Sequence, residues 1–199
     1  MSSALKVRRV LIAEDEALIR LDLKEMLEEE GYLVCGEVGD GESAIRLARE
    51  LRPDLVILDV KMPVLDGISA ADQITGERIS AVVILTAFSQ RDLVERASGA
   101  GAMAYLVKPF QGKDLLPAIE MAISRFSQLL DLEAEVSDLQ GRLAARKVIE
   151  RAKGVLQARH GLTEPEAFRW MQKTAMDRRR SMRAVADGVL TGEDSPGAC

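Results

Sequence analysis

Five short apolar runs divide the first 110 residues, and they limit the possible folds more than any other feature of the chain. Each run has the length of a buried strand. The segments between the runs carry apolar residues at helical spacing and end in glycine or proline, as at Gly31 and Pro53. This alternation predicts an α/β fold, a doubly wound parallel sheet of five strands joined by crossover helices. The runs are residues 10–13, 33–35, 55–58, 81–85 and 104–107.

The pattern changes after Pro109 to a long helix that begins between Gly112 and Asp114 and continues past Arg125 toward Gly141. Apolar residues recur along it at alternating steps of three and four, which is the spacing of a short coiled coil. Two interpretations stay open, an amphipathic helix packed on its own domain and a seam between two copies of the chain. The seam residues are Leu129, Leu132, Val136, Leu139 and Leu143.

The rest of the chain has the pattern of three short helices, broken at His160 and Gly161. Thr163 and Glu166 have the spacing of a capping box, so a helix is expected to begin there. We expect four parts: residues 1–125 form the sheet domain, 126–143 a connector helix, 144–190 a three-helix output domain and 191–199 a disordered tail.

Charge separates the two halves of the molecule. The net charge is −5, yet residues 141–190 hold 12 Lys and Arg against 5 Asp and Glu. An acidic half favours a cation as its partner and a basic half favours a polyanion.

The cysteines and the hydropathy bear on location. Cys35 and Cys199 fit neither a disulfide framework nor a metal cluster, which favours a cytoplasmic protein. No apolar stretch approaches the roughly 20 residues that cross a bilayer. We therefore expect no membrane association.

Acidic residues follow two of the strands. Glu14 and Asp15 come where the first strand ends, and Asp59 comes where the third ends. The carboxyl ends of these strands meet at one edge of a doubly wound sheet. Carboxylates gathered there repel each other unless a cation lies among them, and Mg²⁺ prefers such oxygen ligands.

Two further strand ends complete the pattern. Thr86 ends the fourth strand, and Lys108 follows the fifth, before Pro109, whose peptide bond the sequence leaves open between cis and trans. A carboxylate nucleophile, a metal ion, a fixed positive charge and a hydroxyl group are what phosphoryl transfer to an aspartate requires.

These residues lie in motifs that resemble bacterial receiver domains, with a flavodoxin-like fold, over roughly residues 6–125. The motifs are AEDE at 13–16, LDVKMP at 58–63, DG at 66–67, LTA at 85–87 and YLVKPF at 105–110. The resemblance implies a two-component response regulator that a sensor histidine kinase phosphorylates.

The resemblance also implies roles for single residues. Asp59 would be the phosphoacceptor and Lys108 the phosphate partner, with Thr86 and Tyr105 as the switch pair. Mg²⁺ would be held by Glu14, Asp15, Asp59 and the backbone carbonyl of Lys61. Glu14 stands where an aspartate is more usual, which leaves open whether it binds the metal directly or through water.

Basic residues of the output domain gather in two groups that we expect to bind RNA. They either follow a phosphate backbone or only solvate helix faces. Phe168 and Trp170 either stack on bases or belong to the core, and their apolar neighbours favour the core. The basic groups are Arg142, Arg146, Lys147, Arg151 and Lys153, then Arg178, Arg179, Arg180 and Arg183.

Residues 143–190 resemble the ANTAR domain through IERAKGVL at 149–156, AFRW at 167–170 and KTAM at 173–176. That resemblance implies a three-helix module that binds RNA hairpins in transcription antitermination. Phosphorylation of Asp59 would then control RNA binding, with pairing of two copies as one route. The alternative is a protein-interaction module that binds no nucleic acid. No second catalytic constellation is visible, so we do not expect an enzyme.

Overall fold

The computed structural model of the protein describes residues 7–87 and 99–196. The chain divides into two compact units, Met1–Asp131 and Leu132–Cys199. Within the described ranges, the first unit contains a five-stranded sheet and the second consists of helices.

The sheet of the first unit consists of β1 (Arg9–Ala13), β2 (Leu33–Val38), β3 (Leu55–Asp59), β4 (Ala81–Thr86) and β5 (Ala104–Val107). The strands are all parallel and lie in the order β2-β1-β3-β4-β5. The predicted doubly wound sheet is thereby confirmed. The chain winds in opposite directions from β1, so the carboxyl ends of β1 and β3 lie at the switch point of the topology.

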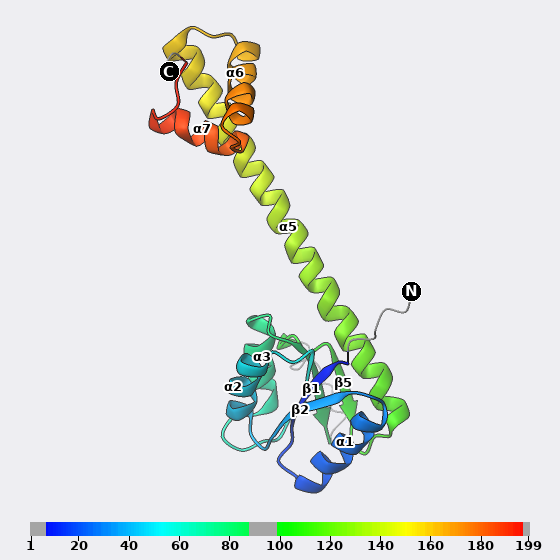
Figure 1. The fold of residues 1–199 in the computed structure, drawn as a ribbon. Coiled ribbons are helices and arrows are strands. Elements are labelled where there is room, and N and C mark those ends of the chain that lie inside the picture. The colour runs from blue at the N-terminus through cyan, green and yellow to red at the C-terminus, as the bar shows by residue number, and fades with distance from the viewer. Residues whose placement is uncertain (1–6, 88–98, 197–199) are drawn as a thin grey trace, which may run out of the picture. The chain divides into compact units, whose positions relative to one another are not determined.

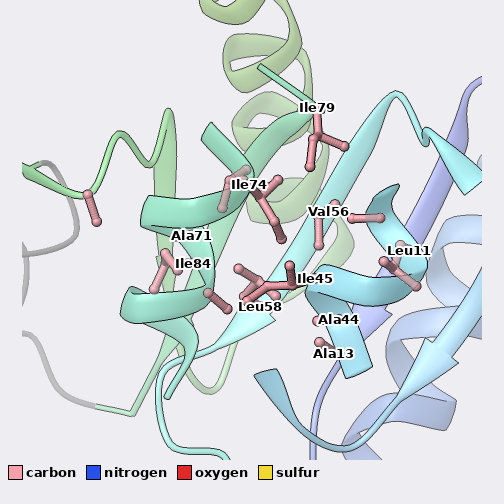
Figure 2. Packing of buried hydrophobic residues seen from close by; sticks show 14 of the residues in the cluster. Leu11, Ala13, Ala44, Ile45, Val56, Leu58, Ala71, Ile74, Ile79 and Ile84 are labelled. Atoms are coloured by element: carbon pink, nitrogen blue, oxygen red, sulfur yellow. The ribbon is translucent and has the colours of Figure 1, made fainter. Parts of the chain in front are cut away.

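Helices cover both faces of this sheet (Figure 1). They are α1 (Ala17–Glu29), α2 (Gly41–Leu51), α3 (Gly67–Gly76) and the first part of α5 (Gly112–His160). Successive side chains of a strand point to opposite faces, so both faces need apolar residues. Val56 and Leu58 pack with α2 and α3 (Figure 2), whereas Leu55 and Ile57 pack with α1 and α5. This two-sided burial explains why the strands read as continuous apolar runs.

The second unit packs the last part of α5 against α6 (Glu164–Asp177) and α7 (Met182–Thr191). Its core contains Leu156, Met171 and Val185, all fully buried. The predicted break is confirmed, since α5 ends at His160 and Gly161 has a φ of +67°. The predicted capping box also forms, with the N–H and hydroxyl of Thr163 both donating to the Glu166 carboxylate.

The seam residues lie on α5, which runs as one helix through the expected connector and the first output helix. Leu132, Val136, Leu139 and Leu143 are each about half exposed or more, at 49–60%. Leu129 is partly buried, so the exposure concerns the last four seam residues, and pairing of two copies through them stays a prediction. The boundaries 1–125, 126–143 and 144–190 stay predictions.

The segment after α7 departs from the expected disorder. Gly192 has a φ of +87°, and the N–H of Asp194 donates to the carbonyl of Gly188 at 3.0 Å. Asp194 is only 2% exposed. Residues 192–196 therefore have a defined place, because the buried Asp194 bonds to Gly188, Arg178 and Arg180, which a polar tail sequence does not reveal. The last part of the tail, 197–199, lies outside the described residues.

Candidate functional site

Three carboxylates meet at the carboxyl ends of β1 and β3. Glu14 and Asp15 follow β1, and Asp59 is the last residue of β3. One oxygen from each of the three lies within 4.8 Å of the others. The register that pairs Ala13 with Leu58 brings the next residues of both strands side by side. The sequence-based prediction of a carboxylate cluster is confirmed in its geometry.

Lys108 is placed among these carboxylates. Its Nζ lies 2.5 Å from Glu14 Oε2 and 2.7 Å from Asp59 Oδ1. Burial alone would lower the pKa of Lys108, but the hydrogen bonds to Asp59 and Glu14 outweigh it and raise that pKa. Burial also raises the pKa of Glu14. The Lys108–Pro109 peptide, left open by the sequence, is cis.

The main chain fixes Asp59 from two sides. Its Oδ2 accepts the N–H of Lys61 at 2.8 Å. Gly67 begins α3 directly against the strand, and a Cβ on Gly67 would lie 1.9 Å from the Asp59 carbonyl oxygen. Only glycine allows α3 to begin this close to the main chain of Asp59. This contact and the Lys61 hydrogen bond together hold Asp59 at the edge of the sheet.

Asp15 and Asp59 border a cleft of about 240 Å³. Asp15 is exposed in it, whereas Glu14 is fully buried and does not belong to the lining. A cluster of hard oxygen donors beside open space suits Mg²⁺, which keeps several waters while a few carboxylates hold it. The lining residues are Asp15, Glu16, Asp59, Val60, Lys61, Thr86, Ala87 and Lys108.

Thr86 and Tyr105 come from neighbouring strands. Thr86 ends β4, is 4% exposed and lines the cleft. Tyr105 lies on β5 opposite Ile84 and is 50% exposed. Both occupy the positions that the receiver resemblance assigns to a switch pair. The switch itself stays a prediction.

The basic residues on α5 divide into two kinds. Arg142, Arg146, Lys147 and Arg151 are exposed. Lys153 is 7% exposed, and its Nζ lies 2.7 Å from Glu164 and 2.9 Å from Glu150. These bonds, to Glu164 first, raise its pKa. Lys153 therefore joins α5 to α6, and it is less available to RNA than its neighbours.

The second basic group surrounds the turn between α6 and α7. The guanidinium groups of Arg178 and Arg180 both bond to the buried carboxylate of Asp194. Arg183 lies 3.9 Å from Asp187, and Arg179 is exposed. Sequence reasoning missed Asp194. The signal that could have found it is Gly188, a glycine within a helix that needs a reason to be there.

The two aromatic residues of α6 have different surroundings. Trp170 packs against the core of the second unit, as expected. Phe168 is 45% exposed, so the favoured core position is wrong for this residue. Phe168 lies one residue after the buried Ala167, and the helix turns its ring away from the core.

The chain matches two family models, the response regulator receiver domain over residues 10–120 and the ANTAR domain over residues 137–190. It is 63% identical to "Transcriptional regulatory protein PdtaR" of Mycobacterium tuberculosis, over 95% of this chain and 92% of that protein. It is 41% identical to "Protein CcdB" of Bacillus subtilis over 112 residues, which cover 56% of this chain and 93% of that one.

Solved structures resemble the sheet domain. A signal receiver domain of a modulated diguanylate cyclase from Desulfovibrio desulfuricans aligns with a TM-score of 0.58 at 32% identity, over 62% of this chain and 98% of that one. The receiver domain of a sensor histidine kinase from Pseudomonas aeruginosa aligns with a TM-score of 0.54 at 32% identity, over 60% and 99%. That structure has a magnesium ion coordinated in its active-site cleft.

The strand order, the carboxylate cluster and Lys108 agree with these matches. No helix within the described residues is both long and apolar enough to span a bilayer. The receiver model covers more than half of the chain, and the ANTAR model follows it. The chain therefore belongs to the two-component response regulators that join a receiver domain to an ANTAR domain.

Proposed function

We propose that this protein is a cytoplasmic regulator in which phosphorylation of Asp59 controls binding of RNA hairpins by the ANTAR domain, and that it acts in transcription antitermination. The single observation that carries the proposal is the open cleft in which Asp59 meets Lys108 and Asp15. A sensor histidine kinase is the proposed phosphoryl donor. The transcriptional role named for the Mycobacterium tuberculosis relative supports the output.

The proposed chemistry starts at Asp59. One carboxylate oxygen attacks the phosphorus of a phosphohistidine, the new O–P bond forms, and the P–N bond breaks with its electron pair on the departing imidazole. Lys108 and Thr86 then contact the phosphoryl oxygens, since Lys108 already lies 2.7 Å from Asp59. The transfer modifies the protein itself, which fits a regulator rather than an enzyme with a separate substrate.

A magnesium ion would neutralise phosphoryl charge when bound. Asp15 and Asp59 present carboxylate oxygens toward the cleft, and Lys61 lines it beside them. Glu14 is fully buried and bonded to Lys108, which favours a contact through water over direct ligation. We therefore assign Asp15, Asp59 and the Lys61 carbonyl to the metal, with Glu14 as the indirect partner.

The proposed RNA surface uses the exposed cations of the second unit. Arg142, Arg146, Lys147 and Arg151 are free of ion pairs in the described structure. Counterion release by such side chains supplies much of the affinity of proteins for nucleic acid. The exposed ring of Phe168 offers a surface on which an unpaired base of a hairpin loop can stack.

Coupling between the sites is proposed to run through Thr86 and Tyr105. Phosphate on Asp59 would draw the Thr86 hydroxyl inward, and Tyr105 would follow, changing the face that the receiver presents. The fourth helix, which we expect to share that face, lies outside the described residues. Exposed leucines of the α5 seam would then pair two copies, so that two ANTAR domains meet one RNA.

The test is recovery of RNA with the full chain, phosphorylated by a small phosphodonor in the presence of Mg²⁺, followed by sequencing. We expect stem-loops to be enriched relative to the Asp59→Asn protein. If about 3–5 phosphates are neutralised, log affinity falls against log salt with a slope of about −2 to −5. A flat salt response with no enriched RNA would favour the protein-interaction alternative.

A further inference from the structure

Asp194 packs directly against Gly188, and the two residues account for each other. Gly188 lies inside α7, where glycine is less favourable than alanine. A Cβ at this position would lie 2.1 Å from Asp194 Oδ2. The N–H of Asp194 also donates to the Gly188 carbonyl at 3.0 Å. The chain after α7 thus folds back and places one carboxylate against the helix.

That carboxylate holds two arginines of the turn between α6 and α7. Its Oδ1 accepts from Arg178, and its Oδ2 accepts from Arg180 at 3.0 Å. Arg180 also donates to the carbonyl of Ala184 at 2.8 Å, which fixes its guanidinium in a second direction. Arg180 is thereby held from two directions, and Arg178 is tied to the same carboxylate.

Burial differs sharply between the partners. The side chain of Asp194 is 1% exposed, whereas those of Arg178 and Arg180 are 46% and 36% exposed. A guanidinium carries five N–H donors, so donors beyond those bonded to Asp194 remain for an outside ligand. Two cations over one carboxylate leave a surplus positive charge at the surface.

We propose that Asp194 is a positioning residue, which holds Arg178 and Arg180 as a two-arginine clamp for a phosphate of the RNA backbone. The inference rests on the proposed RNA binding and deepens it. Asp194 lies beyond the ANTAR match, which ends at residue 190. Arginine forks that are oriented before binding lose less side-chain entropy when they meet a phosphate.

A competing role for the same carboxylate is inhibition, in which Asp194 occupies the place of the phosphate. The geometry argues against it. Asp194 lies beneath the arginines, bonded through its backbone and confined by Gly188, whereas a competitor has to leave when RNA arrives. The two roles predict opposite effects of removing the charge.

The test compares Asp194→Asn with Glu193→Gln in the full-length protein. The probe is a fluorescent RNA stem-loop that the wild-type protein selects from a library with random loops. Each change removes one negative charge from adjacent positions, and Glu193 is exposed. General electrostatics predicts equally tighter binding for both variants. The clamp predicts roughly 5- to 100-fold weaker binding for Asp194→Asn alone, with a salt slope shallower by about 1–2.

Binding is measured well below each variant's unfolding midpoint, so that a purely structural role leaves affinity and salt slope unchanged. Arg178→Lys with Arg180→Lys is the second arm, which keeps the charge and removes the forks, and weaker binding is again expected. Unchanged or tighter binding by Asp194→Asn overturns the clamp. If Asp194→Asn does not fold, the lysine pair decides alone. Absence of any wild-type ligand in the library overturns the proposed function itself.

Discussion

Each unit contains one ion cluster, and the two clusters have opposite ratios of positive to negative groups. In the receiver, the ammonium of Lys108 lies between the carboxylates of Glu14 and Asp59. In the output unit, the carboxylate of Asp194 lies between the guanidinium groups of Arg178 and Arg180. In each cluster the central group bonds to two groups of opposite charge. The receiver cluster therefore has a net charge of −1, and the output cluster a net charge of +1.

The sign of that surplus predicts the ligand. The receiver cluster is left negative, and Asp15 adds to it, so a cation is needed before a phosphoryl group can approach. The output cluster is left positive at the surface, which suits a phosphate. Under these two proposals the same local chemistry serves opposite ligands, and the difference lies in which partner is present twice.

The largest expected effect tests the receiver side. Asp59→Asn should abolish phosphate incorporation from a small phosphodonor with Mg²⁺, because an amide cannot act as the nucleophile. The measurement is mass spectrometry of the intact chain, with the exposed Asp72→Asn as the matched control. Normal incorporation by the Asp59 variant would show that the cluster is not the phosphorylation site.

The second effect tests whether one cluster acts on the other. Phosphorylation is expected to tighten RNA binding roughly 5- to 150-fold, the range of a coupling of about 1–3 kcal/mol. Leu132→Lys and Leu139→Lys should remove the gain and the accompanying rise in sedimenting mass, since both side chains are exposed on the seam. A gain in RNA affinity without a rise in sedimenting mass would show that the coupling acts within one copy of the chain and does not need pairing.

The third effect separates exposed cations from paired ones. Arg146→Glu is expected to weaken stem-loop binding by about tenfold, because one phosphate contact becomes a repulsion. Arg46→Glu on α2 of the receiver makes the same change in net charge and should alter binding far less. Lys153→Glu, which breaks the bonds to Glu150 and Glu164, should instead lower the unfolding midpoint of the output unit. Equal loss of binding for Arg46 and Arg146 would mean that only total charge matters.

The smallest effect concerns a mixed cluster, in which Glu120 accepts from Tyr32 and Arg8. Burial first, and then the bond to Glu120, raise the pKa of Tyr32 to about 12. The folded protein keeps this proton to higher pH than the unfolded chain does, so stability falls as the pH rises from about 10 to about 12. A pKa raised from 10.0 to about 12 corresponds to about 2.7 kcal/mol, which solvent screening at this exposed cluster reduces to about 1–2 kcal/mol. In urea unfolding, the free energy of unfolding of Tyr32→Phe should not show this fall with pH. An identical fall in both proteins would mean that another group causes it.

The receiver is predictable from sequence because its topology places the site. Buried parallel strands are continuous apolar runs, and their order brings Asp15, Asp59 and Lys108 to one edge without any knowledge of side-chain packing. The sequence does not determine the cis isomer of the peptide bond before Pro109, since both isomers are accessible to an X–Pro peptide.

The output unit is less predictable because its faces depend on packing. Helical periodicity groups Lys153 with Arg142 and Arg146, but it does not say which edge of that face meets α6. Phe168 resembles a core residue by its neighbours and is exposed. Asp194 belongs to a polar segment without periodicity, where a buried acid has no pattern of its own.

The contact between Gly188 and Asp194 fixes the order in which these two positions can change over generations. A larger residue at 188 collides with the buried carboxylate as long as position 194 carries it. The aspartate at 194 therefore has to be lost before a larger residue can replace Gly188. Once it is lost, replacing Gly188 by alanine stabilises the helix. For the aspartate to return, position 188 has to become glycine first. That intermediate sequence has the less stable helix and does not yet have the contact with Asp194. Once lost, this pair is difficult for a lineage to regain.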